Sequence, residues 1–94
     1  MKVFISGKIS GLNYEDAKQR FDNASKFLES KGFEVVSPIN DETRYECWCV
    51  QMMRTLSLLL GCDAIFMLKE WEESDGAYIE FTFAKKRGLI IMYE

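Results

Sequence analysis

The chain has 94 residues, 48% of them hydrophobic, with a formal net charge of −3, three cysteines and no histidine. This length supports one domain over residues 1–94, and the scattered basic residues offer no electrostatic surface for a nucleic-acid polymer. The lack of histidine, and of metal-ligand spacing among the cysteines, excludes zinc fingers and both Ser-His-Asp and Cys-His catalysis.

The first part of the chain combines short apolar runs with one helical pattern. Lys2–Ser6 predicts a buried strand, and Asn13, after a Gly/Ser loop, caps a predicted helix that ends at Gly32. Apolar residues recur in that helix at three- and four-residue spacing. Phe33–Ser37 predicts a second strand, which the only proline, Pro38, closes.

The rest of the sequence repeats this alternation twice. We expect a second helix from about Glu42 to Leu60 and then a third strand over Ala64–Leu68. A third helical pattern stops at Gly88, and Leu89–Tyr93 predicts a fourth strand. Strands that are apolar without alternation, with helices between them, indicate a parallel sheet covered on both faces.

The predicted fold is therefore a small doubly wound α/β domain of about four strands in the order 2-1-3-4, with helices on both faces. In such sheets, ligands bind beyond the carboxyl ends of the strands, where the winding reverses. With this order, the reversal lies between the first and third strands. The loops that meet there are residues 6–11 and 69–76.

Glu80 occupies an unusual place in the third helix, which Ser74 or Asp75 caps. At roughly 100° per residue, the solvating side chains Lys85 and Lys86 lie far around the helix from Glu80. Glu80 instead shares its face with small residues, namely Gly76, Ala77 and Ala84. An acid on an inward face is either paired in the interior or directed into a cleft. The pattern alone equally fits a partly exposed acid near the helix start.

The first loop has glycines and donors suited to an anion. The spacing of Gly7 and Gly11 lets the backbone approach a ligand, and polar side chains accompany it. The six candidate ligand-binding residues of this loop are Ser6, Gly7, Lys8, Ile9, Ser10 and Gly11. The loop is neither a Walker motif nor a dinucleotide fingerprint, and most such loops are simple turns.

The second loop contributes two further candidates. Trp71 either packs over the edge of the domain or presents its flat face to a ligand ring. Ser74 is either only an N-cap or a contact for a 5′-hydroxyl or phosphate, together with the free amides of the helix N-terminus.

Three segments carry a resemblance to a known family: Val3–Gly11, Leu59–Asp63 and Trp71–Glu80. This pattern resembles a family of small phage- and bacteria-encoded domains of unknown function. Those domains look like shortened relatives of nucleoside 2-deoxyribosyltransferases and of deoxynucleoside 5′-monophosphate N-glycosidases. The resemblance runs nearly end to end, and it implies a flavodoxin-like fold and cleavage or exchange at an N-glycosidic bond.

The resemblance also implies roles for individual residues. The glutamate that attacks C1′ of the deoxyribose falls on Glu80, and the serine that binds the 5′ end falls on Ser74. The first loop, residues 6–11, would line the sugar or phosphate. Gly76 and Ala77 leave space for a sugar beside Glu80, although small residues also permit tight helix packing. A carboxylate suits this chemistry because it stabilises or traps an oxocarbenium-like state, and no metal or cofactor is required.

The chain departs from these relatives at three places. Their aspartate that helps to protonate the departing base falls on Thr55, which cannot donate a proton at neutral pH. A tyrosine on the first strand of several relatives falls on Phe4. The relatives also continue past the fourth strand with a segment through which a neighbouring subunit completes the pocket, whereas this sequence ends at Glu94.

Three functions from different classes follow. The first is an N-glycosidase or deoxyribosyltransferase that acts on a nucleoside or nucleotide through Glu80. The second is a binding module for a nucleotide or nucleotide-sugar without turnover, which Thr55 favours. The third is an interaction protein that uses the fold only as a scaffold. The chain has no apolar run for a membrane span and no signal peptide, so we expect a cytoplasmic protein without a membrane partner.

The second predicted helix favours a homodimer. Its apolar residues sweep a wider arc than a helix needs to cover one sheet face, so part of this surface is expected to pair with a symmetry mate. The residues of this arc are Trp48, Leu59, Met52, Leu56, Cys49, Leu60 and Met53. The alternative is a monomer in which these side chains fill the space beneath Trp71 and the loop Ser37–Asp41.

Overall fold

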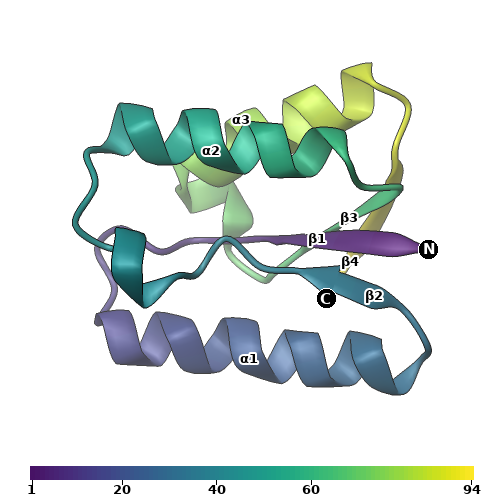
Figure 1. The fold of residues 1–94 in the computed structure, drawn as a ribbon, viewed down its shortest axis with the longest axis horizontal. Coiled ribbons are helices and arrows are strands. Elements are labelled where there is room, and N and C mark those ends of the chain that lie inside the picture. The colour runs from purple at the N-terminus through teal and green to yellow at the C-terminus, as the bar shows by residue number, and fades with distance from the viewer.

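A parallel four-stranded sheet forms the middle layer of the computed structural model, which describes residues 1–94 (Figure 1). Its strands are β1 (Lys2–Ser6), β2 (Glu34–Val36), β3 (Ala64–Met67) and β4 (Ile90–Tyr93). All neighbouring strands pair in parallel, in the order β2-β1-β3-β4. The predicted fold class and strand order are confirmed.

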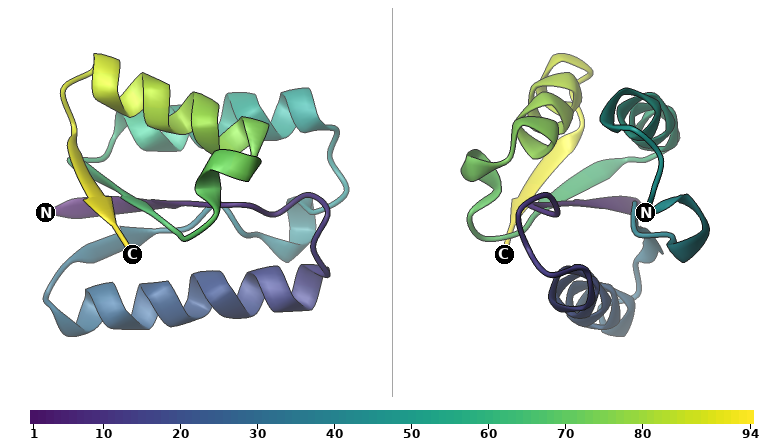
Figure 2. Two further views of the ribbon diagram at one scale, coloured as in Figure 1. Left: turned by 180° about the vertical axis from the view of Figure 1, so that it is seen from behind. Right: turned by 90° about the vertical axis from the view of Figure 1, so that its left-hand side faces the viewer.

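Three helices cover the sheet. They are α1 (Tyr14–Ser30), α2 (Trp48–Leu60) and α3 (Asp75–Lys86). Figure 2 shows α1 on one face and α2 and α3 side by side on the other. Asn13 caps α1 by accepting hydrogen bonds from two backbone amides, and Ser74 caps α3 by accepting from the Ala77 amide. None of these helices has the length and apolar character that a membrane span needs.

Successive strand residues point to opposite sides of the sheet, so consecutive apolar residues make both faces apolar. In β1, Val3 and Ile5 face α1, whereas Phe4 faces α2 and α3. The cluster under α1 includes Phe21, Ala24 and Leu28 from that helix. The opposite cluster includes Leu59, Ala77 and Ala84. This two-sided burial explains why the strands read as unbroken apolar runs.

The start of the second helix differs from the prediction. α2 begins at Trp48, and the segment before it contains only a short 3₁₀ turn, η1 (Asp41–Thr43), which Asn40 caps. The Gln51 side chain donates a hydrogen bond of 2.9 Å to the backbone carbonyl of Glu46. This side-chain bond satisfies a carbonyl outside the helix, and α2 itself begins where the apolar spacing begins.

Gly7 brings the ends of β1 and β3 together. A Cβ atom at this position would lie 2.8 Å from Leu68 Cδ1 and 2.9 Å from Leu68 Cβ. The Leu68 side chain is fully buried, so it cannot move aside without cost. The absent side chain therefore fixes the first loop against the carboxyl edge of the sheet, beside α3.

Candidate active site

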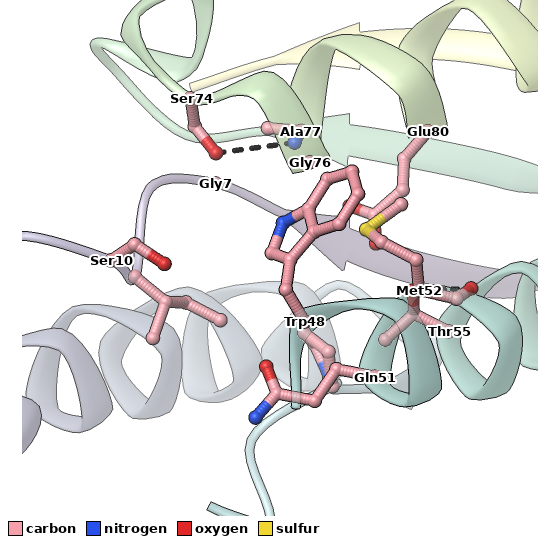
Figure 3. A pocket seen from close by; sticks show the side chains of 12 residues that line it. Gly7, Ser10, Trp48, Gln51, Met52, Thr55, Ser74, Gly76, Ala77 and Glu80 are labelled. Atoms are coloured by element: carbon pink, nitrogen blue, oxygen red, sulfur yellow. Dashed lines mark hydrogen bonds between the residues drawn. The ribbon is translucent and has the colours of Figure 1, made fainter. Parts of the chain in front are cut away.

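A narrow cavity lies at the carboxyl edge of the sheet, where the winding reverses between β1 and β3 (Figure 3). Its walls come from the β1–α1 loop, the segment after β2, the first part of α2 and the start of α3. The lining residues are Gly7, Ile9, Ser10, Pro38, Trp48, Gln51, Met52, Thr55, Ser74, Gly76, Ala77 and Glu80. Segments that are distant in the sequence thus meet where doubly wound sheets bind ligands.

Glu80 is the only carboxylate in the wall of this cavity. It is 5% exposed, and the four ion pairs of the structure all involve other acids. The Ser6 hydroxyl donates a hydrogen bond of 2.6 Å to Glu80 Oε1, and Ser6 is completely buried at the end of β1. The inward position of Glu80 that the helix pattern predicts is confirmed, whereas its catalytic role stays a prediction.

The surroundings of Glu80 alter its acidity in two opposing ways. Burial raises the pKa of its carboxyl above the ordinary value, because a low-dielectric environment disfavours the charged form. The hydrogen bond from Ser6 and, to a smaller extent, the Thr55 hydroxyl lower the pKa by stabilising the carboxylate. Such opposing effects around a carboxyl in a cleft are typical of functional sites.

Replacing Ser6 with alanine is expected to raise the pKa of Glu80 further. The variant removes the strongest group that stabilises the carboxylate, while burial still favours the protonated form. The measurement is a carbon NMR titration of the Glu80 side-chain carboxyl in both proteins. Ser10→Ala is the matched control, because Ser10 lines the cavity without a hydrogen bond to Glu80. An unchanged titration of Glu80 in Ser6→Ala would contradict the assignment of Ser6 as the group that stabilises the Glu80 carboxylate.

Thr55 is a second buried polar residue in the wall of the cavity. It is 6% exposed, and its hydroxyl donates a hydrogen bond of 3.3 Å to the Met52 carbonyl within α2. Its side chain also lies close enough to Glu80 to favour the charged form. Thus a buried, non-acidic hydroxyl stands beside the carboxylate where the resemblance implies a proton donor.

The first loop contributes only part of its predicted set. Three of its residues line the cavity: Gly7, Ile9 and Ser10. Ser6 instead lies beneath the wall and contacts Glu80. Lys8 turns away and forms an ion pair of 3.2 Å with Glu73, because the α3-side loop offers an acid within its reach. Gly11, which has a φ of +84°, lines a neighbouring hollow.

Not all candidate residues of the second loop lie at the cavity. Ser74, Gly76 and Ala77 line the cavity, and Ser74 Oγ accepts a hydrogen bond of 3.2 Å from the Ala77 amide. Trp71 does not line it. The Trp71 ring packs against α3, with its centroid 4.5 Å from that of Phe81, which supports the packing alternative for this side chain.

Sequence reasoning missed several cavity residues. They are Pro38, Trp48, Gln51 and Met52. Pro38 could have been found, since it follows β2 at the same edge of the sheet. The apolar spacing of α2 placed Trp48 and Met52 in a surface arc, because periodicity does not show which side of that arc adjoins a cleft. Nowhere in the structure do three or more histidine, cysteine, aspartate or glutamate side chains gather as potential metal ligands.

The structure defines a small doubly wound α/β domain with one buried carboxylate at its topological switch point. The chain belongs to the family described as Domain of unknown function (DUF4406), whose model matches residues 1–93. No curated protein matches the chain in sequence.

Solved structures that are similar in fold include two enzymes. One is a 2-deoxyribosyltransferase from Leishmania mexicana, with a TM-score of 0.71 and 16% identity over 98% of this chain and 62% of that chain. The other is the Clostridium botulinum CMP N-glycosidase BcmB, with a TM-score of 0.67 and 23% identity over 99% of this chain and 70% of that chain. The present chain thus spans about 62% of the length of the first. At these identities the similarity shows a shared fold.

Proposed function

We propose that this domain cleaves or exchanges the N-glycosidic bond of a deoxynucleoside or nucleotide, with Glu80 as the nucleophile. The observation that carries this proposal is a carboxylate at the base of a cavity, almost fully buried and without a cation. Burying such a group costs several kcal/mol, which a purely structural role does not explain. The two structural neighbours are named for glycosyl transfer and for N-glycosidic cleavage, and this agrees with the proposal.

The proposed reaction has two steps. A carboxylate oxygen of Glu80 forms a bond to C1′ while the C1′–N bond breaks, and the base leaves with that electron pair and takes a proton from solvent. Water or a second base then attacks C1′, loses a proton and releases Glu80. Gly76 and Ala77 keep the wall beside Glu80 free of large side chains. Ser10 and Ser74 offer hydroxyls toward the 5′ end of the substrate.

The direct test is to incubate the purified protein with a panel of deoxynucleosides and deoxynucleoside 5′-monophosphates. Chromatography then measures release of free base, and addition of a second base distinguishes exchange from hydrolysis. Base release from one or more substrates is expected. If no member of the panel is cleaved, the catalytic proposal is wrong.

A binding module without turnover is the second candidate, and Thr55 is the observation that favours it. A hydroxyl buried in place of a proton donor leaves the departing base without an acid from the protein. This candidate predicts that calorimetry detects nucleotide binding while no base is released. A protein that does neither would contradict both candidates.

A homodimer built on α2 is expected. Of the predicted apolar arc, Leu59 is buried in the core, whereas Trp48, Cys49, Met53 and Leu60 are exposed. Val50 and Leu58, which lie outside that arc, are exposed as well. The exposed residues form an unpaired surface that a two-fold contact would bury. Sedimentation at micromolar concentration should give twice the chain mass of 11.0 kDa. Met53→Asp should dissociate the dimer, whereas Phe27→Asp, at an exposed position on α1, should not. A mass that stays at one chain on concentration would refute the dimer.

A further inference from the structure

The cavity above Glu80 is too narrow for a substrate as it stands. Its volume is about 50 Å³, far below the roughly 300–1,000 Å³ of ordinary ligand sites. A hollow of about 410 Å³, open to solvent, lies beside it and has the size of an ordinary ligand site. Four residues belong to the walls of both spaces: Ser10, Trp48, Ser74 and Gly76. A ligand that occupies the hollow and reaches Glu80 must therefore pass these residues.

Trp48 is the only aromatic residue in either wall. It is the first residue of α2, and Figure 3 shows its indole rising from that helix toward Gly76. A Cβ atom at Gly76 would lie 3.7 Å from Trp48 Nε1 and 3.2 Å from Met52 Sδ. The indole thus lies within ordinary contact distance of the start of α3, whereas Met52 Sδ lies close enough that a side chain at Gly76 would crowd it.

Packing does not account for the position of Trp48. The side chain is 48% exposed, whereas a tryptophan usually buries most of its surface. The contrast with the other tryptophan is clear, because Trp71 packs against the rings of Tyr78 and Phe81. A half-exposed indole in the wall of a cleft is a surface on which a flat ring can stack, and such stacking accepts any base.

We propose that Trp48 is the residue on which the nucleobase of the substrate stacks, after its ring has swung outward to admit the sugar to Glu80. This inference rests on the proposed function, since it assigns the base-binding wall of the same site. Rotation of an exposed side chain takes only picoseconds to nanoseconds, so this movement does not limit binding. When C1′ of the sugar is held at Glu80, the base attached to C1′ reaches the wall that the two spaces share. Trp48 is the aromatic side chain in that wall.

The test uses a Trp71→Phe, Glu80→Gln background, in which Trp48 is the only indole and the proposed nucleophile is absent. The ligands are the four deoxynucleoside 5′-monophosphates and 2-deoxyribose 5-phosphate, which has no base. Fluorescence quenching and calorimetry measure binding. We expect each nucleotide to quench Trp48 emission. Adding Trp48→Ala should weaken nucleotide binding about 10-fold or more and leave binding of the sugar phosphate unchanged.

Trp48→Phe is the conservative variant, and it should retain most of the nucleotide affinity, because a phenyl ring still offers a stacking face. Circular dichroism confirms that each variant is folded. An equal loss of affinity for nucleotide and sugar phosphate, or no loss for nucleotide, would overturn the assignment of Trp48.

The same experiments separate this inference from the proposed function. If the wild type releases base and Trp48→Ala does not change the KM of this reaction, only the role of Trp48 is wrong. Base-dependent quenching without base release would overturn only the proposed catalysis and support Trp48 as the stacking residue. If no nucleotide binds at all, both are wrong.

Discussion

Glu80→Gln is expected to abolish base release while the protein stays folded. Glutamine has nearly the shape of glutamate, and its carbonyl oxygen can still accept the hydrogen bond from Ser6. An amide cannot act as the nucleophile at C1′, so we expect a loss on the order of 10⁴-fold or more. Glu80→Ala should be equally inactive.

The measurement is the rate of base release at saturating substrate. Glu72→Gln is the control, because it makes the same chemical change at an exposed position in the loop before α3. That variant should retain full activity. A Glu80→Gln protein with activity near that of the wild type would show that the nucleophile lies elsewhere.

The same substitution is expected to stabilise the protein at neutral pH. The pKa of Glu80 is raised by burial, so its folded state favours the protonated form. As pH rises from the ordinary glutamate value of about 4.3 through the raised pKa, the wild type therefore loses stability. The glutamine side chain of the variant does not titrate, so the advantage of the variant should grow with pH. Urea unfolding at pH 5 and pH 8 measures this difference. An equal difference in stability between the variant and the wild type at both pH values would contradict the raised pKa of Glu80.

Thr55→Asp is expected to increase base release by about 10²–10⁴-fold, the range that a general acid contributes. Thr55 is buried beside Glu80 in the wall of the cavity, so an aspartate there would share its environment. Two carboxyl groups at such close range cannot both ionise easily, so the pair retains a proton near neutral pH. That proton can pass to the departing base.

The matched control is Thr55→Asn, which has the size of the aspartate variant but no acidic proton. Base release should rise in Thr55→Asp and not in Thr55→Asn. The pH dependence should also become bell-shaped, because the pair must hold one proton while Glu80 stays ionised. If both variants gain equally, the increase arises from a change of cavity shape rather than from acid catalysis.

The parallel sheet covered on both faces was predictable because the strands are mainly apolar runs and every crossover contains a helix. The inward position of Glu80 was predictable for a similar reason, since a 3.6-residue period distinguishes the face with Ala77 and Ala84 from the face with Lys85 and Lys86. Both predictions rest on patterns among residues that are close in the sequence. The hydrogen-bond partner of Glu80, Ser6, lies 74 positions away, and only the structure shows it.

The features that the sequence did not predict depend on contacts between distant segments. The segment before α2 contains the turn capped by Asn40 and a carbonyl bound by the Gln51 side chain, and periodicity does not represent these contacts. The place of Trp48 in the cavity depends on how the start of α2 meets Ser74 and Gly76 at the start of α3, a different helix. A hydrophobic pattern identifies an apolar arc, but it does not show that part of this arc faces a ligand space.

The close contact between Gly7 and Leu68 makes tolerance to substitution uneven within a single loop. A side chain at position 7 would collide with Leu68 and force a shift beside the end of β1, where Ser6 meets Glu80. One residue further on, Lys8 turns toward Glu73, and changes there leave the sheet edge untouched. A library designed to alter ligand preference should therefore hold Gly7 constant and vary Lys8 and Ser10, since neither side chain forms a hydrogen bond with the Glu80 carboxylate.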